Sequence, residues 1–159
     1  YKVLADWQKQ YDGNLRIILP DTYGSLIFFK NAPDWLAKWT GVRIDSGNPV
    51  MGAETALKWW DAKGEDTTKK LLIFSDGLDV KAIEGLYERF SSRARLSFGW
   101  GTLLTNDFRG LGVDLDSNPI SLVCKAVSAN GKPTVKISDD FGKSLGQISD
   151  LNRYKRVFA

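Results

Sequence analysis

The sequence predicts an α/β fold in which a parallel sheet or barrel builds one pocket on its rim. Short apolar runs alternate with segments whose apolar residues repeat at helical spacing, which is typical of repeated strand and helix units. Acids, glycines and small hydroxyl residues follow these apolar runs at residues 21–24, 43–47, 75–77 and 99–102. Parallel α/β folds bind ligands at the carboxyl ends of their strands, so these segments indicate a phosphate-and-sugar site.

The first predicted strand and helix lie between the start of the chain and Gly41. The chain begins in a helical pattern, and residues 15–19 are a short apolar and β-branched run, which predicts a strand covered on both faces. Asn31 and Pro33 then offer an N-cap and an early proline for a short helix. We expect this helix to end at Gly41, because glycine is the usual helix stop.

Two further units repeat this order. Residues 42–44 and 71–74 predict strands, and a fourth strand follows at residues 95–98. One helix is expected from about Met51 to Lys63, and a second begins after Asp79, which has the right side chain to cap it. The alternation of strands and helices stops after the fourth strand.

The end of the chain has a β pattern. Residues 120–127 and 134–138 predict two antiparallel strands joined near Asn130-Gly131, the strongest short hairpin signal because both residues tolerate a positive φ. Residues 150–158 predict a last amphipathic helix.

The composition fits one globular domain. The chain has 159 residues, of which 43% are hydrophobic, so it can bury a core. We expect the βα units in residues 1–117 and the hairpin with the last helix in residues 118–159, both within the same domain.

Charge and cysteine content exclude several classes of protein. The net charge of +3 comes from basic and acidic residues spread along the chain, without the basic stripe of a nucleic-acid binder. Cys124 is the only cysteine, so no intramolecular disulfide can form, and a cytoplasmic setting is the default. No membrane-spanning run or signal peptide is evident. We expect no nucleic-acid partner, no membrane and a small-molecule phosphate as ligand.

Arg43 and Asp45 are the first candidate site residues. They are two positions apart, so in an extended backbone both side chains point to the same face. Arginine grips phosphate or carboxylate groups, and aspartate accepts hydrogen bonds from sugar hydroxyls or helps to hold Mg²⁺. The alternative is an ordinary ion pair followed by a turn at Ser46-Gly47.

The later strand ends give weaker signals, each with a structural alternative. Asp76-Gly77 is placed to take ribose hydroxyls, but Asp-Gly is also a common turn. Gly99, Gly101 and Thr102 match neither the Rossmann nor the Walker spacing, but glycines at this place let backbone N–H groups converge on a phosphate. A structural glycine pair beside Trp100 is the rival interpretation. Residues 138–143 are either a ligand loop or a solvated charge cluster, and we favour solvation for Asp140.

Taken in order, these motifs resemble nicotinate phosphoribosyltransferase. The resemblance covers nearly the whole chain and is carried by residues 13–15, 21–24, 43–49, 74–78, 97–107, 136–139 and 142–143. It implies an incomplete TIM-like βα barrel with an added antiparallel β-hairpin. Enzymes of this family are longer, so the chain resembles their carboxyl-terminal portion, with the amino-terminal portion as a missing partner.

The resemblance also implies roles for particular residues. It places three of them at the catalytic centre: Asp21, Arg43 and Asp45. Asp21 and Asp45 would lie near the ribose and Mg²⁺, and Arg43 near the pyridine ring and the pyrophosphate. It assigns phosphoribosyl binding to five others: Asp76, Gly77, Gly99, Gly101 and Thr102. The family pattern more usually reads Asp-Ser-Gly-Asp-Pro, and Asn48 departs from it.

The implied reaction joins nicotinate to phosphoribosyl pyrophosphate, a step of NAD biosynthesis that releases pyrophosphate. The family couples it to ATP hydrolysis through a phosphorylated histidine and forms homodimers. The chain has no histidine, so we expect very low activity from it alone. The alternatives are a related nicotinamide or quinolinate phosphoribosyltransferase and a non-catalytic module that binds phosphorylated sugars.

Overall fold

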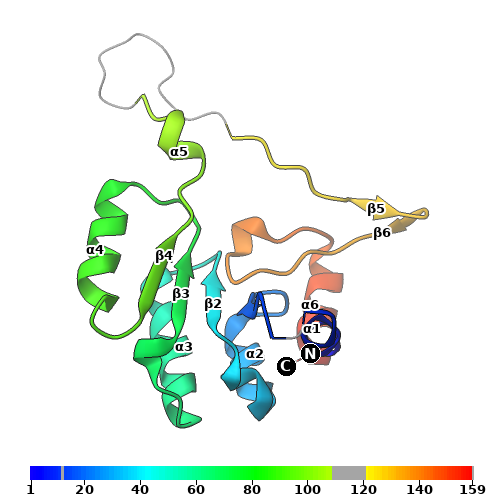
Figure 1. Cartoon of the computed structure of the whole chain (residues 1–159). Helices are drawn as coiled ribbons and strands as arrows, with labels where there is room; N and C mark the ends of the chain where they lie inside the picture. Colours follow the sequence, from blue (N-terminus) through cyan, green and yellow to red (C-terminus); the bar gives the residue numbers. More distant parts are fainter. Residues whose placement is uncertain (12, 109–120, 159) are drawn as a thin grey trace.

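A four-stranded parallel sheet is the centre of the fold. The computed structural model describes residues 1–11, 13–108 and 121–158. The strands lie in the order β1-β2-β3-β4, which is also their order along the chain (Figure 1). Their bounds are Ile17–Ile18, Gly41–Ile44, Leu71–Phe74 and Arg95–Phe98. The predicted α/β fold with a parallel sheet is therefore confirmed.

The register of the sheet brings the strand ends to one level. Ile44 pairs with Phe74, and Phe74 pairs with Phe98, so β2, β3 and β4 all end in the same row. Since the strands are parallel, the segments that follow them meet at one edge, which lies at the top of the sheet in Figure 1. We call this edge the rim.

Helices connect the strands and flank the sheet. Their bounds are Lys2–Tyr11 for α1, Ser25–Asn31 for α2, Pro49–Ala62 for α3, Val80–Phe90 for α4, Thr102–Thr105 for α5 and Ile148–Phe158 for α6. Three short 3₁₀-helices lie at Asp34–Lys38, Thr67–Lys69 and Phe141–Lys143. None of the helices among the described residues has the length and apolarity needed to cross a membrane.

The core lies between one face of the sheet and the helices α3 and α4. Alternate strand residues such as Val42, Leu72 and Phe74 are almost completely buried in it. Four residues of α3 that repeat at helical spacing are buried as well: Ala53, Ala56, Leu57 and Trp60. Burial of each large apolar side chain stabilises the fold by about 1.5–3 kcal/mol.

The opposite face of the sheet is less covered. In β4, Arg95 and Ser97 are exposed, and Arg43 is exposed in β2. Coverage on both faces was predicted only for residues 15–19, and in the described part of the chain this side of β2 and β4 is the less covered one. The physical reason is that α3 and α4 pack into the other face, where the buried strand residues point.

Three elements differ from their predictions. The strand predicted at residues 15–19 is only Ile17–Ile18, because Leu15 has a φ of +53° that no strand residue adopts. The helix expected after Pro33 is the short 3₁₀-helix Asp34–Lys38. Helix α2 was not predicted, since its continuous apolar sequence lacks a helical period.

The hairpin turn lies where it was predicted, but its strands are not the predicted ones: residues 121–127 and 134–138 form no strand, and Lys136 makes only an isolated bridge to Leu145. Strands β5 (Ser128–Ala129) and β6 (Lys132–Pro133) pair antiparallel around Asn130 and Gly131, which have φ values of +51° and +71°. These values match the two central positions of a type I′ turn. The division predicted between residues 117 and 118, and the strand start at residue 120, lie outside the described residues.

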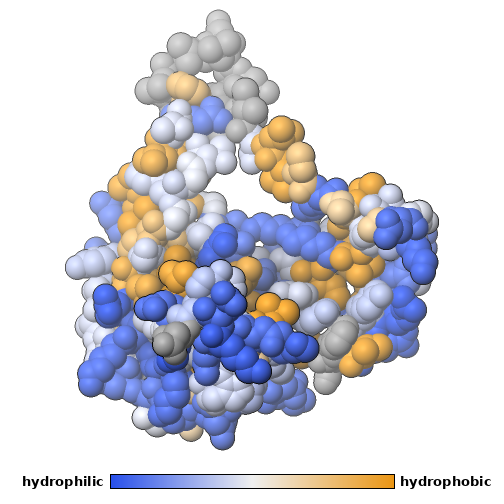
Figure 2. Space-filling view, turned by 45° about the vertical axis from the view of Figure 1, so that its right-hand side comes forward, coloured by the Kyte–Doolittle hydropathy of each residue, from blue (hydrophilic) through white to orange (hydrophobic). Residues whose placement is uncertain are grey.

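The hairpin extends away from the sheet and carries exposed apolar side chains. Leu122, Val123 and Val127 precede β5, and Leu122 is 89% exposed. Figure 1 shows this segment as a long connection that projects from the body. In the face shown in Figure 2, hydrophilic side chains dominate the lower part and hydrophobic ones are exposed higher up.

Candidate functional site

The rim joins the segment after β1 to the segment after β2. The hydroxyl of Ser46 donates a hydrogen bond of 2.6 Å to Oδ2 of Asp21, across 25 positions of sequence. Ser46 is buried, with 6% of its surface exposed, so this hydrogen bond holds the Asp21 carboxylate in place. The Oδ1 atom of Asp21 has no hydrogen-bond donor within the described residues.

Arg43, Asp45 and Ser75 form one hydrogen-bonded group. Arg43 donates from Nη2 to Oδ1 of Asp45 at 2.7 Å and from Nε to Oγ of Ser75 at 2.8 Å. The Ser75 hydroxyl in turn donates to Oδ1 of Asp45 at 2.9 Å. The predicted sharing of one face by Arg43 and Asp45 is confirmed, and they also form the ion pair of the alternative interpretation. Sequence reasoning noted Ser75 but gave it no role.

This group keeps unused hydrogen-bonding capacity. Within the described residues, Nη1 of Arg43 has no acceptor and Oδ2 of Asp45 has no donor. The Arg43 side chain is 44% exposed and that of Asp45 33%. A ligand at the rim could therefore meet a guanidinium N–H and a carboxylate oxygen that are held in place by their other contacts.

Lys143 reaches the rim from the carboxyl-terminal part of the chain. Its Nζ lies 2.6 Å from Oδ1 of Asp76 and donates to the backbone carbonyl of Asp45 at 2.8 Å. The sequence alone leaves two interpretations of residues 138–143 open, a ligand loop and a solvated charge cluster. The structure shows contacts to the rim for this lysine. Asp140, for which we favoured solvation, is half-buried and caps the short 3₁₀-helix by accepting from Gly142 N at 2.8 Å.

Asp139 holds the amino end of α2, a contact that the sequence did not predict. Its Oδ1 accepts from Ser25 N at 2.9 Å, and its Oδ2 accepts from the Ser25 hydroxyl. Gly24 and Gly47 flank it with φ values of +103° and +74°, a backbone conformation that favours glycine. A Cβ on Gly47 would lie 3.4 Å from that of Asp139, so the glycine also permits this close approach.

A cavity of about 270 Å³ lies between the end of β2, α2 and the amino end of α3. Its lining includes the three residues predicted for catalysis, Asp21, Arg43 and Asp45, together with Asp139. Asn48 also lines it and caps α3 by accepting from Met51 N at 3.0 Å. Position 48 therefore has a structural role that requires no charge.

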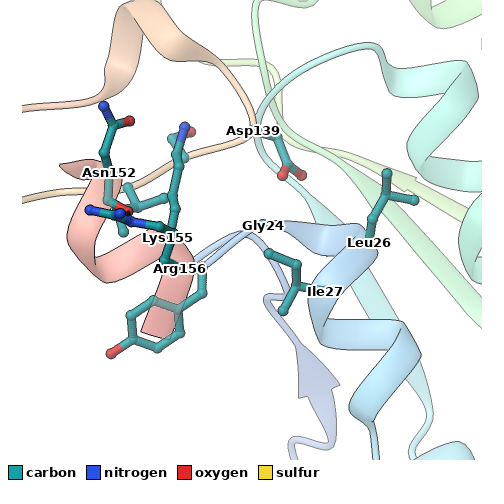
Figure 3. A pocket seen from close by; sticks show the side chains of 10 residues that line it. Gly24, Leu26, Ile27, Asp139, Asn152, Lys155 and Arg156 are labelled. Atoms are coloured by element: carbon teal, nitrogen blue, oxygen red, sulfur yellow. Dashed lines mark hydrogen bonds between the residues drawn. The ribbon is translucent and has the colours of Figure 1, made fainter. Parts of the chain in front are cut away.

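A second and larger cleft adjoins this cavity (Figure 3). It has a volume of about 790 Å³ and lies between α2 and α6, with Leu26 and Ile27 on one side and Lys155 and Arg156 on the other. Asp139 lines both hollows, so the two lie next to each other at this residue.

The predicted phosphate loop lies beside the cavity and does not line it. A Cβ on Gly99 would come within 3.1 Å of the Ser75 Cβ, so Gly99 is next to the rim group. Gly101 faces open space, and Thr102 is exposed at the start of the four-residue helix α5. Gly77 has a φ of +59° and no neighbour at its Cβ position. Asp76 is connected to the rim through Lys143.

The carboxylates at the rim do not form a complete metal cage. Among the described residues, no three His, Cys, Asp or Glu side chains gather as metal ligands. Mg²⁺ usually takes one or two carboxylates together with substrate phosphates and water, and within the described part of the chain Asp21 and Asp45 each keep one carboxylate oxygen without a donor. This set fits a magnesium ion that arrives with a phosphorylated ligand.

Comparisons with known proteins agree on one family. The sequence model of the nicotinate phosphoribosyltransferase (NAPRTase) family matches residues 2–159. The chain is similar to the crystal structures of the nicotinate phosphoribosyltransferases from Vibrio cholerae (37% identity, TM-score 0.85) and Porphyromonas gingivalis (32%, 0.82). It is also similar to that of a putative nicotinate phosphoribosyltransferase from Saccharomyces cerevisiae (30%, 0.82). Each match covers 99% of this chain but only 38–41% of the other chain, so this chain spans about two fifths of their length.

Proposed function

The chain belongs to the nicotinate phosphoribosyltransferase family, and we propose that it supplies the phosphoribosyl-binding part of an enzyme that makes nicotinate mononucleotide. The substrates would be nicotinate and phosphoribosyl pyrophosphate. The observation that carries the proposal is the cavity at the rim, where Asp21, Arg43 and Asp45 come together from two different strand ends. In this proposal the parallel sheet is one part of an incomplete TIM-like barrel.

The rim offers suitable charges for this reaction. When the pyrophosphate leaves the ribose C1, positive charge develops on the sugar and negative charge on the leaving group. Arg43 would bind the pyrophosphate through its unused Nη1, since Nε and Nη2 are already held by Ser75 and Asp45. The carboxylate oxygens of Asp21 and Asp45 that have no donor among the described residues would favour the cationic sugar. The nucleophile is the pyridine nitrogen of nicotinate, so the chain needs to supply none.

The other residues bind and orient in this proposal. Asp76 would accept hydrogen bonds from ribose hydroxyls, and Gly77 gives the backbone room beside it. Gly99, Gly101 and Thr102 would hold the 5′-phosphate next to the cavity. Magnesium held by Asp21, Asp45 and substrate oxygens would neutralise charge on the pyrophosphate.

We further propose that the complete enzyme couples this reaction to ATP and acts as a homodimer. The chain contains no histidine, so a phosphorylated histidine would have to come from the part of the relatives that this chain does not span. Turnover by the chain alone is therefore expected to be very low, whereas binding of phosphoribosyl pyrophosphate needs only the rim.

Calorimetry with phosphoribosyl pyrophosphate and Mg²⁺ tests the proposal. We expect the wild-type chain to bind this ligand, and Asp45→Asn to bind it more weakly because the carboxylate loses its charge. Nicotinate mononucleotide formation is measured in parallel with nicotinate, nicotinamide and quinolinate as bases. Absence of binding by the wild-type chain would contradict the proposed role of the rim. Robust ATP-stimulated turnover by the chain alone would refute the need for an outside histidine.

A further inference from the structure

Lys143 connects two segments of the rim that are far apart in sequence. Its ammonium contacts the Asp76 carboxylate at 2.6 Å in the segment after β3 and the Asp45 carbonyl at 2.8 Å in the segment after β2. Asp45 and Lys143 are 98 positions apart. The ammonium thus lies between these two loops, which are also joined directly by the hydrogen bond of 2.9 Å from Ser75 to Asp45.

The lysine is presented by an anchored segment. Ile137 and Ser138 are buried, with 7% and 5% of their surfaces exposed. Backbone hydrogen bonds of 2.9 and 3.0 Å join Lys136 and Leu145 on either side of the segment. Figure 1 shows this segment, in orange, beside the carboxyl ends of the strands. Anchoring on both sides reduces the entropy that Lys143 loses on making its contacts.

These features distinguish the contact from an ordinary surface ion pair. Exposed pairs usually contribute little to stability, because water and salt screen them and both side chains lose freedom. The Lys143 side chain is only 32% exposed, and one of its two acceptors is a backbone carbonyl that cannot swing away. Without the ammonium, Asp76 would remain as an uncompensated carboxylate close to a site for an anionic ligand.

We propose that Lys143 is a positioning residue that joins the segments after β2 and β3 into one rigid rim and orients Asp76 and Asp45 toward phosphoribosyl pyrophosphate. This inference rests on the proposed function for the identity of the ligand. The lysine acts through Asp76 and the Asp45 backbone. Preorganised groups bind more tightly because their ordering does not have to accompany binding.

The test compares Lys143→Met and Lys143→Arg with the control Lys63→Met in the full chain. Lys63 is matched in burial, with a side chain 33% exposed and an ion pair to the distant Asp34, but it lies away from the rim. Calorimetry with phosphoribosyl pyrophosphate and Mg²⁺ gives the affinity, and amide hydrogen exchange gives the opening of residues 45–47 and 75–77.

We expect Lys143→Met to weaken binding about 10-fold or more and to speed exchange in both segments. Lys143→Arg should recover part of the affinity, since it keeps the charge and the donors, and Lys63→Met should change neither readout. Equal affinity for Lys143→Met and wild type would overturn the proposal. If the wild-type chain does not bind the ligand, the proposed function fails, and the amide hydrogen exchange of residues 45–47 and 75–77 alone tests the role of Lys143. Unchanged exchange in both segments then rejects the link between the loops, and faster exchange in both supports it.

Discussion

Replacing Arg43 by Met should separate ligand binding from stability. The substitution removes the hydrogen bonds of 2.8 Å to Ser75 and 2.7 Å to Asp45 while keeping most of the apolar stem. Because the side chain is 44% exposed, its ion pair is screened by water, and we expect the free energy of unfolding to fall by less than about 1 kcal/mol.

The effect on binding should be larger. A hydrogen bond to a charged group contributes about 1.5–3 kcal/mol when its partner cannot be replaced by water. Loss of one such contact to the pyrophosphate corresponds to binding about 10- to 150-fold weaker. Calorimetry with phosphoribosyl pyrophosphate and Mg²⁺ measures the affinity, and urea unfolding measures the stability.

Arg95→Met is the matched control for this experiment. Arg95 is also exposed in a strand of the same sheet and lies on the same face, but at the amino end of β4, away from the rim. It should leave the affinity unchanged. If Arg43→Met bound the ligand as well as wild type, or if both variants lost affinity equally, the assignment of Arg43 to the pyrophosphate would be refuted.

Three further predictions concern stability, and urea or thermal unfolding checks each. Lys70→Met should lower the free energy of unfolding by about 3 kcal/mol, because the buried ammonium contacts Glu65 at 2.8 Å and two backbone carbonyls. A loss below about 1 kcal/mol would contradict this prediction. Hydrogen bonds from Lys38 and Lys70 lower the pKa of Glu65. The ionised carboxylate therefore contributes fully to the free energy of unfolding above about pH 4.3, and this contribution is lost as the pH falls through the lowered pKa. Glu65→Gln should flatten this acid dependence, and an unchanged profile would argue against it. Asn48→Ala should cost about 1 kcal/mol by removing the cap on α3, whereas Asn48→Asp should not.

The elements predicted best from the sequence are those set by local patterns. The strands Leu71–Phe74 and Arg95–Phe98 have the predicted bounds, because a short apolar run and a short alternation of polar and apolar residues both fit a strand better than a helix. Asp79 caps α4 as predicted, accepting from Ala82 N at 2.9 Å. Helix α2 could not be predicted in this way, since a run of consecutive apolar residues fits a buried strand as well as a helix.

The contacts between distant segments could not be predicted. The sequence could place Asp21, Arg43 and Asp45 together because Asp21 and Asp45 follow successive strands and Arg43 lies near the end of one, and a parallel sheet brings such positions to one edge. Asp139 and Lys143 reach the same edge from a segment outside the sheet, and no local pattern encodes that approach. Their signals in the sequence were the mixture of charge and glycine in residues 138–143, which solvated loops share, and the place of residues 136–139 and 142–143 in the family resemblance.

Mapping of the bound ligand by NMR tests the central claim most directly. Phosphoribosyl pyrophosphate with Mg²⁺ is titrated into the isotope-labelled chain, and the shifts of its backbone amides are followed. We expect the largest changes in residues 21–25, 43–48 and 75–77, around the cavity that Asp21, Arg43 and Asp45 line. Changes confined to the cleft between α2 and α6, or no saturable changes at all, would contradict a phosphoribosyl site at the rim.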